Sequence, residues 1–195
     1  VNYALHPTDH GGDDSFSAGW PGVLAQKMKA NGCLCLFLNG AYGNISSADP
    51  TRSGKALTME ETGAALSEQV MQVLKGVKPE SFRSDATLDS RARRVKLPYR
   101  EPTPDQIKGA ARGAQRFIDP AIYDRIIPGL VEQIRSSDGT ISTELQVQSI
   151  GDIDYVGVPC EWFVELGLQL KERLHPRRAL VVGSANDIVG YVPIA

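Results

Sequence analysis

Short apolar, strand-like segments alternate with amphipathic helical segments along most of this 195-residue chain, and that alternation limits the folds open to it. Strands are predicted at about 1–5, 33–38, 141–150, 153–158 and 179–182, and helices at about 20–31, 59–75 and 162–174. When helices separate most of the strands, each helix can cover one face of a shared sheet. The sequence therefore predicts a layered α/β domain with a largely parallel or mixed central sheet flanked by helices.

The helix predicted at 59–75 has the clearest local signals. Thr58 and Glu61 have the spacing of a capping box, in which each side chain accepts a hydrogen bond from the other residue's backbone N–H. Apolar and small side chains then recur at helical spacing, which predicts one core-facing side made of Met59, Thr62, Leu66, Val70, Val73 and Val77.

The region from 78 to 137 interrupts the alternation. Basic residues alternate with others between Arg91 and Lys96, a pattern typical of an exposed or edge strand whose charges discourage aggregation. Two helices are predicted after it, at 104–117 and 120–136, and an Asp138-Gly139 turn then leads into the next strand. We therefore expect a single domain over 1–195 with a helical insertion at about 78–137.

Composition excludes several classes of protein. Hydrophobic residues make up 42% and charged residues 23% of the chain, as in soluble globular proteins. The net charge of -2 leaves no basic excess for binding a polyanion, which argues against a nucleic-acid partner. No apolar run approaches the ~20 residues of a bilayer-spanning helix. The chain starts at Val1 and ends in apolar residues, so we expect a truncated piece of a longer polypeptide.

Polar residues and glycines follow several of the predicted strands. His6 follows the first strand, the segment 39–47 follows the second, Glu161 follows the strand at 153–158, and Tyr191 lies beyond the last. In open α/β sheets, ligands bind beyond the carboxyl ends of the strands. These segments are therefore expected to meet in one polar site.

His6 and Glu161 are the sharpest candidates for metal ligands, because imidazole nitrogen and carboxylate oxygen both suit Zn²⁺. Each has an ordinary interpretation as well, since a lone His is more often a hydrogen-bonded structural residue and a Glu at a helix start is favoured by the helix dipole. Ser46 follows the turn Gly40–Gly43, whose N–H groups are suited to an oxyanion, although spacing alone favours an ordinary turn serine.

The remaining histidines and the cysteines have simpler predictions. His10 is expected in a loop and His175 at an exposed helix end. Cys33 and Cys35 would share one face of a strand, where a disulfide has poor geometry and no partner residues are spaced for a metal. They are predicted to be small buried hydrophobic residues.

Taken together, these segments resemble the catalytic domain of the neutral/alkaline, non-lysosomal ceramidase family. The segments that support the resemblance are, in chain order, Asn2–Pro7 with Ser17–Gly22, then Phe37–Ser46, and finally Val158–Glu161 with Gly183–Asn186 and Gly190–Pro193. They span nearly the whole chain, although the region 78–137 has no such mark.

The resemblance implies a zinc-dependent amidohydrolase that splits the amide of an N-acyl sphingosine-type lipid into a fatty acid and a sphingoid base. Its implied site residues are His6, Glu161 and Tyr191 as Zn²⁺ ligands, Ser46 as the active-site serine, and Gly40, Gly43 and Asn44 in an oxyanion or substrate loop. Because no base adjacent to Ser46 can be identified, metal-activated water is the expected nucleophile.

The chain also departs from the family's pattern. The family's His-x-His segment, which supplies a first zinc histidine and a proton-donating histidine, is absent, so the metal site is incomplete unless His10 substitutes. Gly19 and Asn44 stand where the family usually has Asp, and Cys160 stands where Gly is usual. Two alternatives therefore remain open: a non-catalytic ceramidase-like domain for assembly or surface binding, and a zinc hydrolase of another amide or ester.

The resemblance implies a small lipid substrate of the ceramide type and allows peripheral contact with a membrane. It favours a secreted or periplasmic location. The oligomeric state and the acyl-chain length of the substrate do not follow from the residues.

Overall fold

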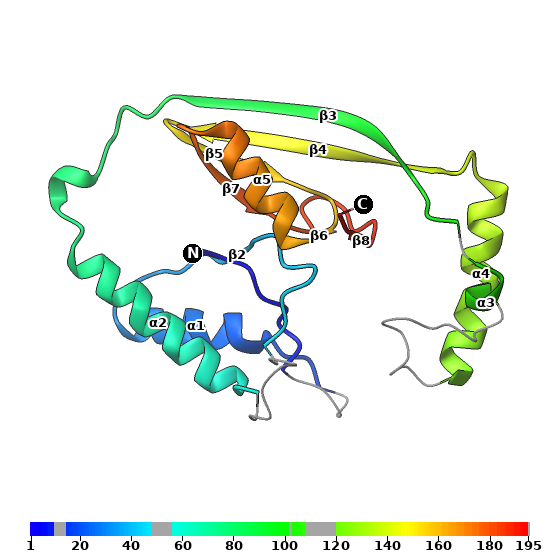
Figure 1. Cartoon of the computed structure of the whole chain (residues 1–195). Coiled ribbons are helices and arrows are strands. Elements are labelled where there is room, and N and C mark those ends of the chain that lie inside the picture. Colours follow the sequence, from blue (N-terminus) through cyan, green and yellow to red (C-terminus); the bar gives the residue numbers. More distant parts are fainter. Residues whose placement is uncertain (10–14, 48–55, 102, 108–119, 195) are drawn as a thin grey trace. The chain divides into compact units, whose positions relative to one another are not determined.

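Strands that are far apart in the sequence lie next to one another in the computed structural model of this chain (Figure 1). The structure describes all residues except 10–14, 48–55, 102, 108–119 and 195. It divides into two compact units, of which the larger comprises 1–93 with 144–195 and the smaller comprises 94–143. Each unit is treated on its own below.

The helices and strands of the larger unit alternate along the chain. Its helices are α1 (Gly19–Ala30), α2 (Met59–Lys75) and α5 (Val164–Leu174), with a short 3₁₀ helix at Pro79–Ser81. Its strands are β1 (Asn2–Tyr3), β2 (Leu38–Asn39), β5 (Ile153–Gly157), β6 (Glu161–Trp162), β7 (Arg178–Val182) and β8 (Tyr191–Val192). Strands β3 (Leu88–Pro98) and β4 (Thr140–Ile150) run through both units.

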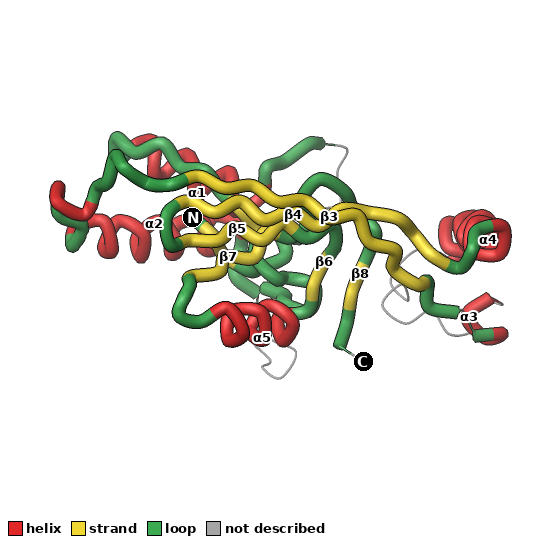
Figure 2. Tube along the Cα trace, turned by 90° about the horizontal axis from the view of Figure 1, so that it is seen from above, coloured by secondary structure: helices red, strands yellow, loops and turns green. Residues whose placement is uncertain are grey.

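The main sheet is mixed. Its strand order is β3-β4-β5-β7, and Figure 2 shows these strands side by side. β4 pairs antiparallel with β5, β5 pairs parallel with β7, and the short pairs β1–β2 and β6–β8 are parallel. Because α5 packs against β7, this arrangement confirms the predicted α/β class with a mixed sheet flanked by helices.

Two apolar clusters stabilise the larger unit, since burial of apolar surface is the main favourable term in folding. One forms where β5 and β7 meet and includes the buried side chains of Val156, Val158 and Val181, against which Leu170 and Leu174 of α5 pack. The other forms around α1 and comprises Leu5, Trp20, Leu24 and Met28, with side chains of α2 packed against it.

The contact between α1 and α2 depends on a glycine. A Cβ atom added at Gly63 would lie 2.6 Å from Val23 Cβ and 2.8 Å from the carbonyl oxygen of Trp20. The two helices therefore approach too closely at this point for any side chain. At the start of α2, Thr58 and Glu61 form both hydrogen bonds of the predicted capping box.

The predicted core face of α2 is correct over its first half and wrong at its end. Thr62 is buried, and Met59, Leu66 and Val70 pack against the α1 cluster. Val73 and Val77 are exposed, Val73 at 69%. The 12-residue α1 is shorter than the 17-residue α2 and ends near Ser67 and Met71 of α2, so the last turns of α2 extend beyond the end of α1.

The strand predicted at 33–38 is mostly an extended segment without ladder pairing. Only Leu38 and Asn39 pair with β1, while the side chains before them still alternate between two faces. Cys33 and Cys35 face the α1 cluster as free, half-buried thiols, whereas Leu34 and Leu36 are exposed. The shared face of the two cysteines is confirmed, and full burial is not.

The region predicted as a helical insertion contains strand as well as helix. β3 lies at the edge of the sheet with nearly all its side chains exposed, which confirms the predicted edge strand. Helix α4 (Pro120–Ser136) matches the helix predicted at 120–136. Of the helix predicted at 104–117, the described part is α3 (Pro104–Ile107), and the rest lies outside the described residues. The single-domain organisation stays a prediction, since residues 94–143 group as a unit of their own.

In the smaller unit, the predicted Asp138-Gly139 turn connects α4 to β4. Gly139 has a φ of 77°, in the left-handed region that favours glycine. Asp138 accepts a hydrogen bond from the Thr140 N–H at 3.1 Å and one from Lys96 Nζ at 2.6 Å. Because both charged groups are exposed, the ion pair orients the turn more than it stabilises the fold.

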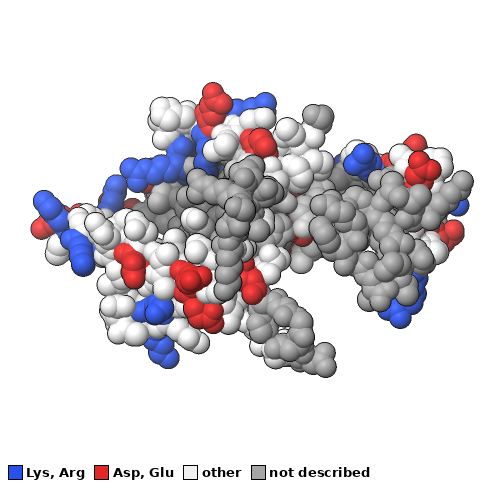
Figure 3. Space-filling model, turned by 60° about the horizontal axis from the view of Figure 1, so that its bottom comes forward, with Lys and Arg blue, Asp and Glu red and all other residues white. Residues whose placement is uncertain are grey.

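Basic and acidic side chains both occur on the face shown in Figure 3. Figure 3 shows basic and acidic side chains interspersed with uncharged ones over the described part of one face. Among the residues that the structure describes, no helix has the length and apolar character to cross a bilayer.

An ion pair connects the end of the main sheet with the loop after α5. Asp154 of β5 is 6% exposed and accepts hydrogen bonds from Arg177 Nε and from Ser149 Oγ, both at 2.6 Å. These bonds, that of Arg177 first, lower the pKa of the Asp154 carboxyl from 3.8 to about 2. The ionised carboxylate therefore favours the folded state.

We expect Asp154→Asn to lower the stability of the protein at neutral pH, and the loss to shrink in acid. A carboxyl whose folded pKa is depressed stabilises the fold above about pH 4, and this contribution disappears as the pH falls to about 2. Denaturation midpoints of both proteins measured between pH 7 and pH 2 check this. A stability difference between the two proteins that stays constant down to pH 2 would contradict a stabilising role of the ionised Asp154 carboxylate.

We expect the same substitution to have opposite effects in two helices. Gly63→Ala forces α1 and α2 apart and should destabilise by about 1–3 kcal/mol. Gly129→Ala lies in α4, where an added Cβ meets nothing within 4 Å, and should stabilise by about 0.5–1 kcal/mol through helix propensity. Chemical denaturation measures the free energy of unfolding of both variants. Equal destabilisation by the two substitutions would refute the close approach of α1 and α2 at Gly63.

Candidate active site

Four segments that follow strands meet in the larger unit, as the sequence predicts. The connections are backbone hydrogen bonds between residues far apart in sequence. With the donor first, they are His6 to Ile45 at 3.2 Å, Gly43 to Trp162 at 2.7 Å, Glu161 to Gly190 at 3.0 Å, Gly183 to Asn39 at 2.9 Å and Ser184 to Cys160 at 3.1 Å. This network fixes the backbone around one group of polar side chains.

His6, Glu161 and Tyr191 lie together at this junction. His6 Nε2 is 3.4 Å from Glu161 Oε2, and both side chains are about four-fifths buried. The rings of His6 and Tyr191 have centroids 6.1 Å apart. Glu161 and Tyr191 are Cα partners in the parallel pair β6–β8, so their side chains leave the backbone on the same face.

The His6 side chain is held in a defined orientation. Its backbone N–H donates to Ile45, and its carbonyl oxygen accepts a hydrogen bond from Trp20 Nε1 at 3.4 Å. The imidazole lies edge-on to the ring of Tyr42, with centroids 4.8 Å apart and an interplanar angle of 87°. Nε2 also lies 3.4 Å from the carbonyl oxygen of Gly43.

The pair His6 and Glu161 fits two ligands of one zinc ion. Glu161 Oε2 is buried and accepts no hydrogen bond from the described residues, although His6 Nε2 lies near it and the carboxylate interacts with Tyr191. Zinc bonds of about 2.1 Å at a tetrahedral angle place two ligand atoms roughly 3.4 Å apart. The observed separation of 3.4 Å between Nε2 and Oε2 equals this value.

The phenol of Tyr191 is the third candidate zinc ligand at the junction, beside His6 and Glu161. Burial raises the pKa of Tyr191 to about 12, and the Glu161 carboxylate adds to this rise through a hydrogen bond and through its charge. The phenol is therefore neutral at physiological pH in the metal-free protein. Its side chain remains 53% exposed, so the junction is open to solvent on this side.

The described residues contain no group of three His, Cys, Asp or Glu side chains placed to hold a metal ion. The cluster at the junction has two such residues and a tyrosine. His10, the predicted substitute for the missing histidine, lies outside the described residues. His175 follows α5 as an exposed helix end, which confirms its prediction.

The glycines of the turn 40–43 allow close packing. The Gly40 N–H donates to Tyr3 O at 3.0 Å and the Gly43 N–H donates to Trp162 O, so both groups already have partners within the protein. A Cβ atom at Gly43 would lie 2.4 Å from the carbonyl oxygen of Glu161. The contacts thus give these glycines a packing role, and their implied role toward an oxyanion stays a prediction.

Asn44 and Ser46 follow this turn and are both exposed. Asn44 Oδ1 accepts a hydrogen bond from the Val164 N–H at 2.8 Å, and its amide nitrogen lies 3.0 Å from Glu165 Oε2. Asn44 therefore caps the first turn of α5 and fixes the turn to that helix. Ser46 directly follows Ile45, which accepts the hydrogen bond from His6, so its backbone lies beside that histidine.

Sequence reasoning missed two features of this junction. Tyr42 contacts His6 and forms a hydrogen bond with Ser184, whose Oγ lies 2.7 Å from the Tyr42 hydroxyl oxygen. The two-residue strands β6 and β8 also escaped prediction, because a pair this short has no periodic pattern. Only the position of Tyr42 inside the glycine turn hinted at a role.

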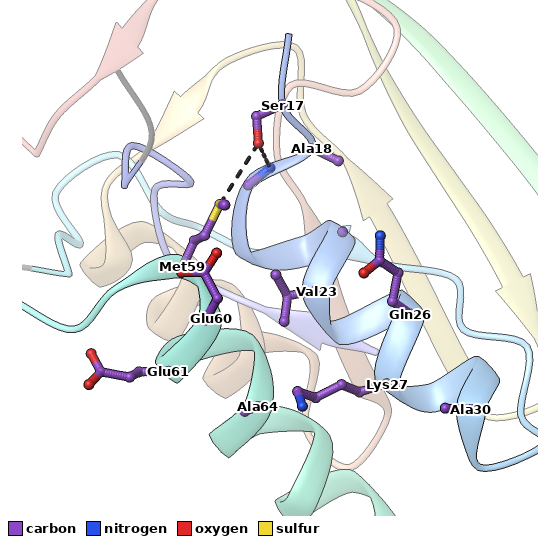
Figure 4. Close-up of a pocket in the computed structure, with 12 residues that line it drawn as sticks. Ser17, Ala18, Val23, Gln26, Lys27, Ala30, Met59, Glu60, Glu61 and Ala64 are labelled. Atoms are coloured by element: carbon purple, nitrogen blue, oxygen red, sulfur yellow. Dashed lines mark hydrogen bonds between the residues drawn. The ribbon is translucent and has the colours of Figure 1, made fainter. Parts of the chain in front are cut away.

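A large groove of the larger unit lies away from this junction. It is an open groove of about 690 Å³ between α1 and α2, lined mainly by small and apolar residues. Figure 4 shows Ser17 at one end, where its hydroxyl lies 3.8 Å from Met59 Sδ. None of the residues at the His6–Glu161 junction lines this groove, so its size is no evidence for the site.

We expect Cys160 to resist alkylation in the native protein. It is 1% exposed, and burial followed by the charge of Glu161 raises the pKa of its thiol to about 12. Iodoacetamide at pH 8 should modify Cys33 and Cys35 roughly 100-fold or more faster, because the thiolate is the reactive form. Peptide mass spectrometry measures the rates, with the denatured protein as control, and equal native rates would contradict the burial.

No protein-family model matches the chain, and no curated protein matches its sequence. Among solved structures, the neutral ceramidase from Pseudomonas aeruginosa matches with a TM-score of 0.64 and 14% identity, over 97% of this chain and 37% of that one. A ceramidase complexed with C2 matches with a TM-score of 0.61 and 15% identity, over 98% and 39%. The chain spans 37–39% of the length of these structures and has a ceramidase-like fold.

Proposed function

We propose that this chain forms part of a zinc-dependent amidohydrolase that cleaves the amide of an N-acyl sphingoid base. The observation that supports it most is the buried Glu161 Oε2, which accepts no hydrogen bond from the described residues and lies 3.4 Å from His6 Nε2. Tyr191 lies beside both groups, and the surrounding fold is similar to that of neutral ceramidases.

In this proposal, His6 Nε2, a Glu161 carboxylate oxygen and the Tyr191 phenol hold the zinc. The ion supplies Lewis acidity, which polarises an amide carbonyl and lowers the pKa of a water molecule toward neutrality. The chain supplies the orientation of the ligands. Trp20 and Ile45 fix the backbone of His6, and the β6–β8 register places Glu161 next to Tyr191.

The proposed reaction consumes one water molecule. A C–O bond forms between the water oxygen and the acyl carbon, the C–N bond breaks, and the nitrogen takes a proton, giving a fatty acid and an amino alcohol. We assign Ser46 to orient the attacking water or the amide, because it is exposed and adjacent to Ile45 beside His6.

One exposed apolar side chain on the segment before β8 fits a lipid substrate. Ile188 is 68% exposed, and the next residue, Val189, donates its N–H to Pro159 O, two residues before Glu161. An apolar substrate approaching along this segment would meet the junction directly. With this substrate we also propose peripheral contact with a lipid surface and a secreted or periplasmic location.

A second candidate is a non-catalytic domain with the same fold. It is favoured by the absence of any three-residue His, Cys, Asp or Glu cluster in the described part of the chain, and by the engaged N–H groups of Gly40 and Gly43. In that case the junction would serve folding and not hydrolysis. Metal binding and hydrolysis, measured together, separate the two candidates.

We expect the purified chain to bind zinc in a 1:1 ratio, and His6→Ala and Glu161→Gln each to weaken this binding at least 10-fold, since a first ligand matters no less than an outer-shell partner. His175→Ala is the matched control, because His175 is an exposed histidine at a helix end and should leave zinc affinity unchanged. Competition against a chromophoric chelator measures the affinity. Equal zinc affinity in wild type and both variants would end the zinc proposal.

The substrate is tested separately on the full-length protein with a fluorescent N-acyl sphingosine. We expect hydrolysis that a chelator abolishes and that added zinc restores. Zinc binding without hydrolysis of this or any related amide or ester would favour the second candidate.

A further inference from the structure

We infer that Tyr42 is a positioning residue that holds the His6 imidazole toward Glu161 and is itself fixed by its hydrogen bond to Ser184. The inference rests on the proposed zinc site, since it assigns a residue that orients one of the proposed ligands. Neither Tyr42 nor Ser184 is a proposed ligand.

The first step is the contact between the rings. The imidazole of His6 and the phenol ring of Tyr42 meet at 87° with centroids 4.8 Å apart, an edge-to-face geometry favourable for aromatic pairs. The backbone bonds of His6 fix its Cα but leave the side-chain torsions free. The Tyr42 ring, packed edge-on against the imidazole, therefore acts together with the Gly43 carbonyl contact to keep Nε2 directed at Glu161.

The second step concerns what fixes the Tyr42 ring. The Tyr42 hydroxyl oxygen lies 2.7 Å from Ser184 Oγ, the distance of a good O–H···O hydrogen bond. Ser184 has a φ of 52°, which few residues other than glycine adopt readily. Ser184 comes directly after Gly183, where the backbone is closely packed. Its N–H donates a hydrogen bond to Cys160 O.

The third step is the space that admits the Tyr42 ring. A Cβ atom at Gly183 would lie 2.9 Å from Tyr42 Cε1 and 2.6 Å from the carbonyl oxygen of Gly40. Only a glycine at this position lets the ring lie against the end of β7. The ring is thus confined along its edge by Gly183 and at its hydroxyl by Ser184.

These contacts connect the two sides of the junction. Ser184 bonds to Cys160, the residue before Glu161, and Tyr42 contacts His6. The Tyr42–Ser184 hydrogen bond therefore connects the histidine side to the glutamate side, in addition to the backbone bond from Gly43 to Trp162. Tyr42 belongs to neither buried apolar cluster, which separates this role from core packing.

The test uses two variants that remove the same hydrogen bond from opposite ends. Tyr42→Phe keeps the ring and deletes the hydroxyl, and Ser184→Gly deletes the hydroxyl while suiting the positive φ. Tyr155→Phe is the control, since Tyr155 of β5 lines a separate pocket on the sheet. Zinc affinity, thermal unfolding and NMR of the His6 ring are measured on each full chain.

We expect Tyr42→Phe and Ser184→Gly each to weaken zinc binding about 10-fold, as loss of an outer-shell partner does. The double variant should lose no more than either single variant, because both remove one interaction. Tyr155→Phe should leave zinc affinity unchanged. Unchanged affinity in both single variants, or additive losses in the double variant, would overturn the inference.

NMR of the zinc-free chain keeps this outcome distinct from a failure of the proposed zinc site. We expect contacts between His6 and Tyr42 ring protons in the wild type, and weakened contacts with broadened His6 ring signals in Tyr42→Phe and Ser184→Gly. If the chain binds no zinc but these signals respond as expected, the positioning role stands while the zinc proposal fails. His6 signals that are identical in all variants would refute the positioning role, whatever the zinc affinity.

Discussion

The parallel register of β6 and β8 is the constraint on which the rest of the junction depends. It sets Glu161 opposite Tyr191 and presents the carbonyl oxygen of Trp162 to the Gly43 N–H. Through that bond the glycine turn is fixed, and through Ile45 the turn fixes the backbone of His6. A shift of one residue in this register would move Glu161 to the opposite face and separate it from the imidazole. The two residue pairs of β6 and β8 thus help to bring Glu161 close to Tyr191 and His6.

A buried carboxylate oxygen without a donor is unfavourable, because the group has lost its water without a replacement. Glu161 Oε2 is in this state, although the same junction satisfies most of its backbone groups and the Tyr42 and Ser184 hydroxyls. If position 161 served only hydrogen bonding, a neutral side chain would cost less to bury there than a carboxylate. A cation shared with His6 would compensate such an oxygen, and the proposed zinc site rests on this argument.

The sequence predicted the parts of the fold that local physics determines. The capping box at Thr58, the edge strand rich in arginine and the turn at Gly139 each depend on a few neighbouring residues. The meeting of His6 with Glu161 followed from a topological rule about strand ends, without any local pattern. The exposure of Val73 could not be predicted, because it depends on where α1 ends, and the bond between Tyr42 and Ser184 joins residues 142 positions apart.

Low sequence identity to the ceramidase structures is compatible with a shared fold, because different residues can satisfy the same packing requirements. Close approach at Gly43 and Gly183 demands the absence of a side chain, whereas the apolar clusters tolerate exchange among residues of similar volume. A functional site tolerates residue exchange less than an apolar core does, since ligand atoms must lie within tenths of an ångström of their positions. In the proposed site, a tyrosine within the glycine turn would contribute to that precision, and the orientation of His6 would then depend on a contact outside the proposed ligand set.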